Sequence, residues 1–233
     1  FDFNIERAEL SLPKNGFIMG WCSRIEKILP NVLDTWMKVV GKYEDVYLAL
    51  RIDNKVVIDN INFYCKENNL NFDQILFLKP IKEHKDNLRR ISTFNLYLDT
   101  YPYNGHSAIS DSLFQSCVPT ISFTGKSFAS RVSYSLLKSL KLEQFVTFNE
   151  KEYLDKIANF KENGTFQRVI YESLKKYIYI FENKKLLKKN PGLDNLIVIN
   201  RAFESFYLGS KNTDVYFLNI INKNDINYSK YIF

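Results

Sequence analysis

The chain has 233 residues, a net charge of +6, and a hydrophobic content of 45%. These values are typical of a globular chain with a sizeable core, and they exclude a disordered or collagen-like protein. No apolar run approaches the roughly 18 to 20 residues that a membrane-spanning helix needs.

Short β-like runs alternate with amphipathic helical stretches from about residue 15 to 160. We expect strands at residues 16–22, 46–52, 75–78, 96–98 and 120–123. Helices are expected at 31–40 (with Asn31 as N-cap), 57–65, 82–91, from about 106 onward, and over 128–140 with Phe128, Val132, Leu136 and Leu140 on one face. This alternation predicts an α/β fold with a Rossmann-like, doubly wound, mostly parallel sheet.

The expected domain boundary lies near residue 160. Residues 1–160 read as a nucleotide-sugar-binding Rossmann-like domain, and 161–233 as a C-terminal helical extension packed on it, with helices at 166–181 and 195–207. The chain opens with Phe1 rather than Met, so we expect a fragment or a processed piece.

Cysteine and lysine usage bear on localisation and partners. The three cysteines are far apart in apolar stretches, which favours reduced, buried thiols in a cytoplasmic protein and offers no metal site. The lysines are scattered or occur in short runs that suit a solvated helix face. Nucleic acid is therefore not an expected partner, and steeply salt-dependent binding to duplex DNA would revive that interpretation.

The most informative segment covers residues 96–137, LYLDTYPYNGHSAISDSLFQSCVPTISFTGKSFASRVSYSLL. A strand ends near Asp99, a loop follows, and a helix begins near His106 or Ser107, whose free N–H groups form an anion site. Asp111, one turn later, is placed to accept hydrogen bonds from ribose hydroxyls. A second strand-to-helix loop of this kind follows at residues 125–127.

The residues alone leave simpler interpretations open. Ser107 could serve only as a helix cap, and Asp111 could only favour the positive end of its helix. The Gly-Lys-Ser triplet at 125–127 does not complete a P-loop, because that motif needs glycine where Thr120 stands.

The run from Leu98 to Leu137 resembles the UDP-binding region of the O-GlcNAc transferase family, glycosyltransferase family 41, with its SPINDLY-like and bacterial members. A weaker match covers GFIMGWCSRIEKILPNVLDTW, residues 16–36. The resemblance spans roughly residues 15–160, and several spaced motifs agree in order. It implies the C-terminal, donor-binding half of a GT-B fold.

The resemblance also implies roles for matching residues. Lys27 matches the lysine that contacts the donor diphosphate and stabilises the leaving group, and it is the predicted catalytic residue. His106 and Ser107 match the loop that wraps the phosphates, and Asp111 the aspartate that holds the ribose. The predicted nucleotide-sugar-binding set is completed by Ala108, Arg24 and Asn87.

Four positions depart from the family pattern. Ala108 replaces a threonine of the phosphate loop, and Asn87 stands where the family has a base-contacting histidine, two residues before Arg89. His84 replaces a lysine and Arg24 a glutamine. His84 is also a candidate general base, although its pattern is that of a surface helix residue.

The implied activity is inverting transfer of GlcNAc from UDP-GlcNAc to Ser or Thr hydroxyls of a protein or peptide, without metal or other cofactor. The chain has no Asp-x-Asp pair for a metal clamp. We expect it to be inactive without the upstream GT-B half, which in this family often follows helical repeats. Alternatives are a fucosyl-type donor, a glycan acceptor, or a non-catalytic nucleotide-binding or interaction module.

Overall fold

The computed structural model describes residues 5–140, 142–164, 167, 170–172 and 174. Within this part the strands are β1 Phe17–Trp21, β2 Val46–Leu50, β3 Ile75–Phe77, β4 Leu96–Leu98, β5 Thr120–Phe123 and β6 Val146–Thr147. The α-helices are α1 Pro30–Lys42, α2 Lys55–Glu67, α3 His84–Ile91, α4 Ser107–Ser110, α5 Val132–Ser139 and α6 Glu150–Glu162. Shorter helical turns are η1 Arg7–Leu10, η2 Ile25–Lys27, η3 Phe72–Gln74, η4 Asp111–Gln115 (a π-helix), η5 Phe128–Ser130 and η6 Glu143–Phe145.

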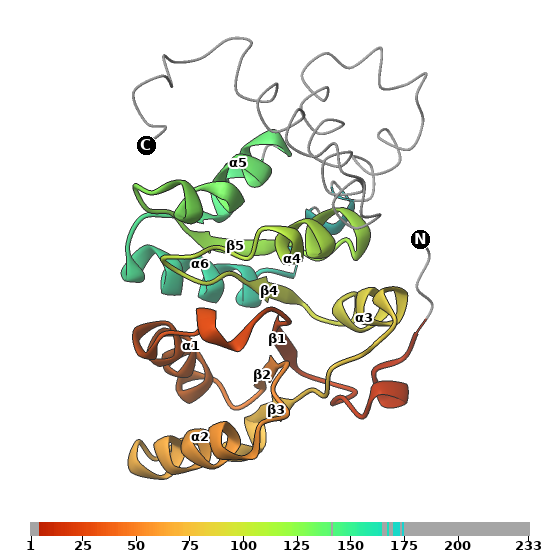
Figure 1. The fold of residues 1–233 in the computed structure, drawn as a ribbon, viewed down its shortest axis with the longest axis vertical. Coiled ribbons are helices and arrows are strands. Elements are labelled where there is room, and N and C mark those ends of the chain that lie inside the picture. The colour runs from red at the N-terminus through yellow and green to blue at the C-terminus, as the bar shows by residue number, and fades with distance from the viewer. Residues whose placement is uncertain (1–4, 141, 165–166, 168–169, 173, 175–233) are drawn as a thin grey trace. The chain divides into compact units, whose positions relative to one another are not determined.

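The strands form one parallel sheet in the order β3-β2-β1-β4-β5-β6. Figure 1 shows this succession from β3 at the bottom through β1 and β4 to β5. The predicted doubly wound parallel sheet is confirmed, and the five expected strands all form. β6 and α6 were not predicted, and β6, with only two residues, is too short to leave a periodic signal.

Local sequence explains where the helices begin. Asn54 caps α2 by accepting hydrogen bonds from the backbone N–H groups of Val56 and Val57. Helix α1 begins at Pro30, whose fixed φ suits the first helical position, and Leu29 rather than Asn31 occupies the N-cap. The expected cap at Asn31 is therefore wrong by two residues, because the proline itself enters the helix.

Large side chains fill the space between the sheet and its helices. All five residues of β1 are buried, as expected for a central strand covered on both faces. Trp21 of β1 packs against Trp36 of α1 with ring centroids 6.3 Å apart, and the Trp36 indole donates to Tyr153 of α6 at 3.2 Å. These contacts join α1, α6 and the middle of the sheet into one core.

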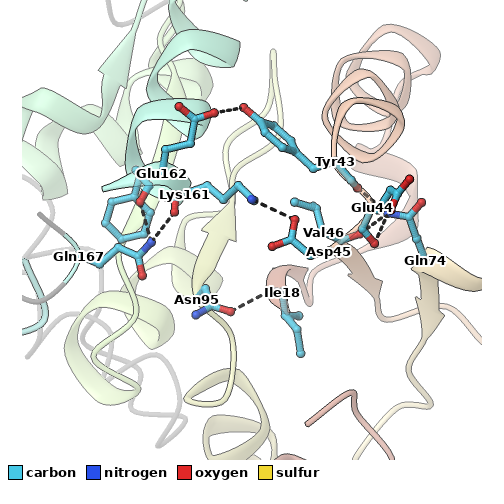
Figure 2. Close-up of polar contacts among 11 residues, drawn as sticks. Ile18, Tyr43, Glu44, Asp45, Val46, Gln74, Asn95, Lys161, Glu162 and Gln167 are labelled. Atoms are coloured by element: carbon cyan, nitrogen blue, oxygen red, sulfur yellow. Dashed lines mark hydrogen bonds and ion pairs between the residues drawn. The ribbon is translucent and has the colours of Figure 1, made fainter. Parts of the chain in front are cut away.

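Polar contacts close the amino-terminal edge of the sheet, where the strands begin (Figure 2). Lys161 Nζ lies 2.9 Å from Asp45 Oδ1, just before β2, and the Tyr43 hydroxyl donates to Glu162 at 2.6 Å. Gln74 Nε2 donates to the Val46 carbonyl at 2.7 Å, and Asn95 Oδ1 accepts from Ile18 N. This edge is occupied by internal bonds, so the opposite edge is the one left for function.

The chain divides into two units after Lys176, and every described residue lies in the first. The predicted helices at 166–181 and 195–207 lie largely or wholly outside the described residues, and the boundary at residue 160 stays a prediction. None of the helices in the described part is long and apolar enough to cross a membrane.

Candidate functional site

The strand order creates a switch point between β1 and β4. From this central pair the chain moves toward β2 on one side and toward β5 on the other. In such sheets the loops that leave the two central strands diverge and open a crevice for ligands at the carboxyl ends. Lys27 lies in the first of these loops, in η2, and His106 in the second, so the topology brings the two predicted residues to the same place.

The loop after β4 is held by a buried carboxylate. Asp99 is only 2% exposed, and its Oδ1 accepts from the backbone N–H groups of Thr100, at 2.9 Å, and Gly105, at 2.7 Å. Its Oδ2 accepts from the Ser122 hydroxyl at 2.7 Å. The fully buried Asn104 donates from its amide to the Thr100 carbonyl at 2.9 Å. Hydrogen bonds to the buried side chains of Asp99 and Asn104 therefore fix the backbone conformation of this loop.

Lys27 reaches across the switch point to this loop. Its Nζ donates to the Asn104 carbonyl at 2.7 Å and lies 3.9 Å from the centre of the Tyr103 ring. Burial lowers the pKa of Lys27, the charge of Asp99 raises it, and that of Arg24 lowers it. Within the described residues Lys27 forms no ion pair with a carboxylate, so its remaining N–H groups are available to an anionic ligand.

His106 stands at the start of α4 in an unusual conformation. Its φ is 41° and its ψ is −105°, and its ring lies edge-on to Tyr103 (5.1 Å) and to Phe128 (6.2 Å). Burial, and then the charge of Lys27, lower the pKa of His106, while a hydrogen bond to the Ala129 backbone opposes this shift. Within the described residues, no backbone carbonyl accepts a hydrogen bond from the backbone N–H groups of His106 and Ser107. They are free donors at a helix start, the arrangement that binds phosphate.

Ser107 and Ala108 form the first turn of α4. His106 occupies the N-cap, so Ser107 is not the cap residue that the simpler interpretation required. The Ala108 N–H donates to the Gly105 carbonyl at 2.9 Å and is thereby used inside the loop. The half-buried Ser107 is therefore the residue of this turn that has both a free N–H group and a hydroxyl.

Asp111 lies one turn further and is 5% exposed. Its Oδ1 accepts from Gln115 Nε2 at 3.0 Å and lies 3.6 Å from Nε2 of His84, the first residue of α3. Both partners engage the same oxygen, Oδ1, and orient this buried carboxylate as an acceptor for ligand hydroxyls. His84, expected as a surface residue, is indeed 44% exposed at its side chain, but it adjoins the site.

The two remaining predicted residues flank this centre. Asn87 is half-buried on α3, and its Oδ1 accepts from Arg90 Nη2 at 2.7 Å, so its amide orientation is set by a buried guanidinium. Arg24 is exposed, directly precedes η2, and acts on Lys27 through its charge. Asn87 lies on the same helix, α3, as His84, which adjoins Asp111, and Arg24 lies three residues before Lys27.

The predicted second anion loop, at residues 125–127, is closed on itself. Gly125 N donates to the Ser130 carbonyl at 3.0 Å, and the hydroxyls of Ser127 and Ser130 are 2.9 Å apart. The single helix predicted over 128–140 is also wrong, because η5 and α5 are separate and Phe128 is 66% exposed instead of buried. The Gly125 N–H and the Ser127 hydroxyl, which a ligand would need, are therefore bonded within the turn. The turn also places the Phe128 ring near His106.

Sequence reasoning missed the residues that support the site. Asp99 was taken only as the end of a strand, and Asn104 only as part of a turn, yet together they shape the loop that Lys27 contacts. The available signal was an acidic residue directly after a buried parallel strand, a position where a polar side chain needs internal partners.

Comparison with known proteins gives the family. The family model "Glycosyl transferase family 41" matches residues 4–185, which is most of the chain. This chain belongs to glycosyl transferase family 41. The predicted membership is thereby confirmed, and the family is one of glycosyltransferases.

Curated relatives of this family 41 chain are much longer than it is. It is 26% identical over 205 residues to the probable UDP-N-acetylglucosamine–peptide N-acetylglucosaminyltransferase SPINDLY of Solanum lycopersicum, covering 83% of the chain and 20% of the relative. It is 28% identical over 148 residues to the UDP-N-acetylglucosamine–peptide N-acetylglucosaminyltransferase of Caenorhabditis elegans, covering 64% of the chain and 13% of the relative. The chain thus spans a fifth or less of the length of these two proteins.

Solved structures support the fold. The K341M mutant of the Thermobaculum terrenum O-GlcNAc transferase aligns with a TM-score of 0.69 at 21% identity, over 78% of this chain and 35% of that one. A sucrose-phosphate synthase from Thermosynechococcus elongatus aligns with a TM-score of 0.55 at 15% identity, over 88% of this chain and 49% of that one. The family 41 chain therefore has the Rossmann-like α/β fold of a GT-B glycosyltransferase domain.

Proposed function

We propose that this chain is the donor-binding part of an inverting protein O-glycosyltransferase that transfers GlcNAc from UDP-GlcNAc to Ser or Thr hydroxyls. The observation that carries the proposal is the meeting of Lys27 with the loop before α4 at the β1–β4 switch point, 2.7 Å from the Asn104 carbonyl. The names of the tomato and nematode relatives support the donor class.

The chemistry of the proposed reaction suits these groups. As the glycosidic bond breaks, negative charge grows on the departing diphosphate. The Lys27 ammonium and the free N–H groups of His106 and Ser107 would stabilise that charge more in the transition state than in the ground state. Their geometry is already set before the ligand arrives, which reduces the cost of reorganisation.

Asp111 is proposed to hold the ribose. Its carboxylate is buried, and Gln115 and His84 both engage its Oδ1, so it is oriented to accept hydrogen bonds from ribose hydroxyls. Burial makes each such bond to a charged acceptor stronger than an exposed one, on the order of 1.5–3 kcal/mol. The acceptor side and the general base are proposed to belong to the complementary half of the fold.

Calorimetric titration of the full chain with UDP, GDP and UDP-GlcNAc, without added metal, tests the proposal. UDP should bind, and Asp111→Ala should weaken binding by at least about tenfold because a ribose acceptor is lost. Asp59→Ala, a surface change on α2, is the matched control and should leave affinity unchanged. If Asp111→Ala bound UDP as tightly as the unmodified chain, the ribose role would be wrong.

A fucosyl-type donor is the second candidate, and one observation favours it. Asn87, which Arg90 orients, stands where the family pattern has a base-contacting histidine. A changed contact at this position could accommodate a different base. Binding of GDP but not of UDP in the same titration would replace the first proposal with this one.

A further inference from the structure

The Asp99 carboxylate closes the loop after β4 into a ring of bonds. It accepts from the N–H groups of both Thr100 and Gly105, so the two ends of a six-residue segment meet on one oxygen. The residue before Gly105 is Asn104, whose carbonyl accepts from Lys27. A short path of bonds therefore runs from Asp99 through the loop backbone to the Lys27 ammonium.

The side chain of Asn104 strengthens this path. It is fully buried, donates to the Thr100 carbonyl at 2.9 Å, and accepts from the Ser133 N–H at the start of α5 at 3.4 Å. The Thr100 hydroxyl donates in turn to the Tyr103 carbonyl at 2.8 Å. Both groups that Lys27 contacts, the Asn104 carbonyl and the Tyr103 ring, thus belong to the segment that Asp99 closes.

Asp99 is also a buried carboxyl group that hydrogen bonds stabilise in place of an ion pair among the described residues. Within the described residues it forms no ion pair, and its partners are N–H groups and hydroxyls. Burial raises the pKa of Asp99, and its hydrogen bonds oppose that rise. The charged and titratable groups that act on or adjoin Lys27 are Asp99, which favours the ammonium, Arg24, which disfavours it, His106, and the Tyr103 ring.

We propose that Asp99 is a positioning residue for Lys27: it shapes the 99–105 loop that receives the ammonium and places a buried negative charge behind it. The inference rests on the proposed function in one respect, namely that Lys27 faces the donor diphosphate. Asp99 itself is 2% exposed and acts through Gly105 and Asn104.

Titration of Lys27 in the full, ligand-free chain is the first test. With ¹³C-methylated lysines, NMR should show the pKa of Lys27 falling by about one unit in Asp99→Asn, because an opposite charge is removed. The asparagine oxygen can still accept from Thr100 and Gly105. Asp45→Asn, which removes an exposed carboxylate at the opposite edge, should leave Lys27 unchanged. An unaltered Lys27 pKa in Asp99→Asn would overturn the proposal.

A reciprocal measurement covers the case in which Asp99→Asn does not fold. Coupling between two sites is equal in both directions, so Lys27→Met should raise the pKa of the Asp99 carboxyl by the same amount. Lys27 is half-buried at the surface, and its replacement leaves the core intact. Lys38→Met, which removes an exposed lysine of α1, is the control. No change at Asp99 in Lys27→Met would contradict the proposal.

Nucleotide binding separates the proposal from the function on which it rests. Asp99→Asn should keep UDP affinity within about twofold near pH 6, where Lys27 is protonated with or without Asp99, and should lose more affinity at alkaline pH, up to about tenfold for a one-unit fall in the Lys27 pKa. A loss that is equal at both pH values would indicate a merely structural role and overturn the inference. If the unmodified chain bound no UDP, the proposed function would fail for this chain, while the ligand-free titrations would still decide the role of Asp99.

Discussion

At the scale of single residues, Lys27 is the side chain whose surroundings say most about chemistry. It is held by a carbonyl and an aromatic ring rather than by a carboxylate, and burial lowers its pKa. An ammonium with spare N–H groups at a strand switch point suits a diphosphate that gains charge during a reaction. The same geometry would also suit a domain that only binds nucleotide.

Lys27→Ala distinguishes these two possibilities. In an enzyme the transfer rate should fall by about a hundredfold or more, with a much smaller loss of nucleotide affinity, because the ammonium acts mainly in the transition state. Affinity is measured on this chain by calorimetry, and turnover with the chain joined to the complementary half of the fold. The exposed Lys126→Ala serves as control. A loss confined to affinity would indicate a non-catalytic nucleotide-binding module.

At the scale of elements, β1 is the strand on which the site depends, because the Lys27 loop leaves from its carboxyl end. Gly20 lets the ring of Phe94 pack directly on this strand. A Cβ built at Gly20 would lie 1.9 Å from Phe94 Cδ2, a distance that no relaxation of a flexible chain end can relieve. The close approach therefore fixes how the chain before β4 lies on β1.

Gly20→Ala should destabilise the fold by at least about 2 kcal/mol, because the ring of Phe94 must leave its place in a packed core. The measurement is urea unfolding followed by tryptophan fluorescence. Gly164→Ala is the matched control, since a Cβ there meets nothing within 4 Å and stability should hardly change. Equal stability of the two variants would show that the β1 contact is adaptable.

At the scale of the whole molecule, stability in alkali should depend on Cys22, just after β1. Burial raises the pKa of this thiol to about 11 from 9.0, despite the opposing charges of Arg90 and Arg51. Between these values the unfolded chain loses the proton and the folded chain keeps it. The contribution of the protonated Cys22 thiol to the free energy of unfolding is therefore complete below about pH 9 and is lost as the pH rises toward 11.

Cys22→Ala should flatten this alkaline loss. Between about pH 9 and 11, we expect the free energy of unfolding to fall by about 2 kcal/mol more in the unmodified chain than in the variant. The cost of the smaller side chain is the same at every pH and does not affect this difference. Urea unfolding at several pH values, under reducing conditions, measures the difference. Parallel curves for the two proteins would place the alkaline loss on other groups, such as the buried Tyr97.

The amino-acid sequence by itself determined the parallel α/β fold, the five main strands, and the positions of His106, Ser107 and Asp111 at the carboxyl edge, while Lys27 was predicted from the family resemblance. It could do so because buried parallel strands are continuous apolar runs, and because ligands bind where such strands end. These signals are local, so they can be read along the chain.

The tertiary structure alone decided how those positions are supported. The hold of Asp99 on Gly105, the Asn104 carbonyl beneath Lys27, and the approach of His84 to Asp111 join residues from different loops and helices. It also closed the 125–127 loop on Ser130 and exposed Phe128, against expectation. Hydrogen bonds between distant segments follow no sequence period, because partners are chosen by the packing of the whole fold.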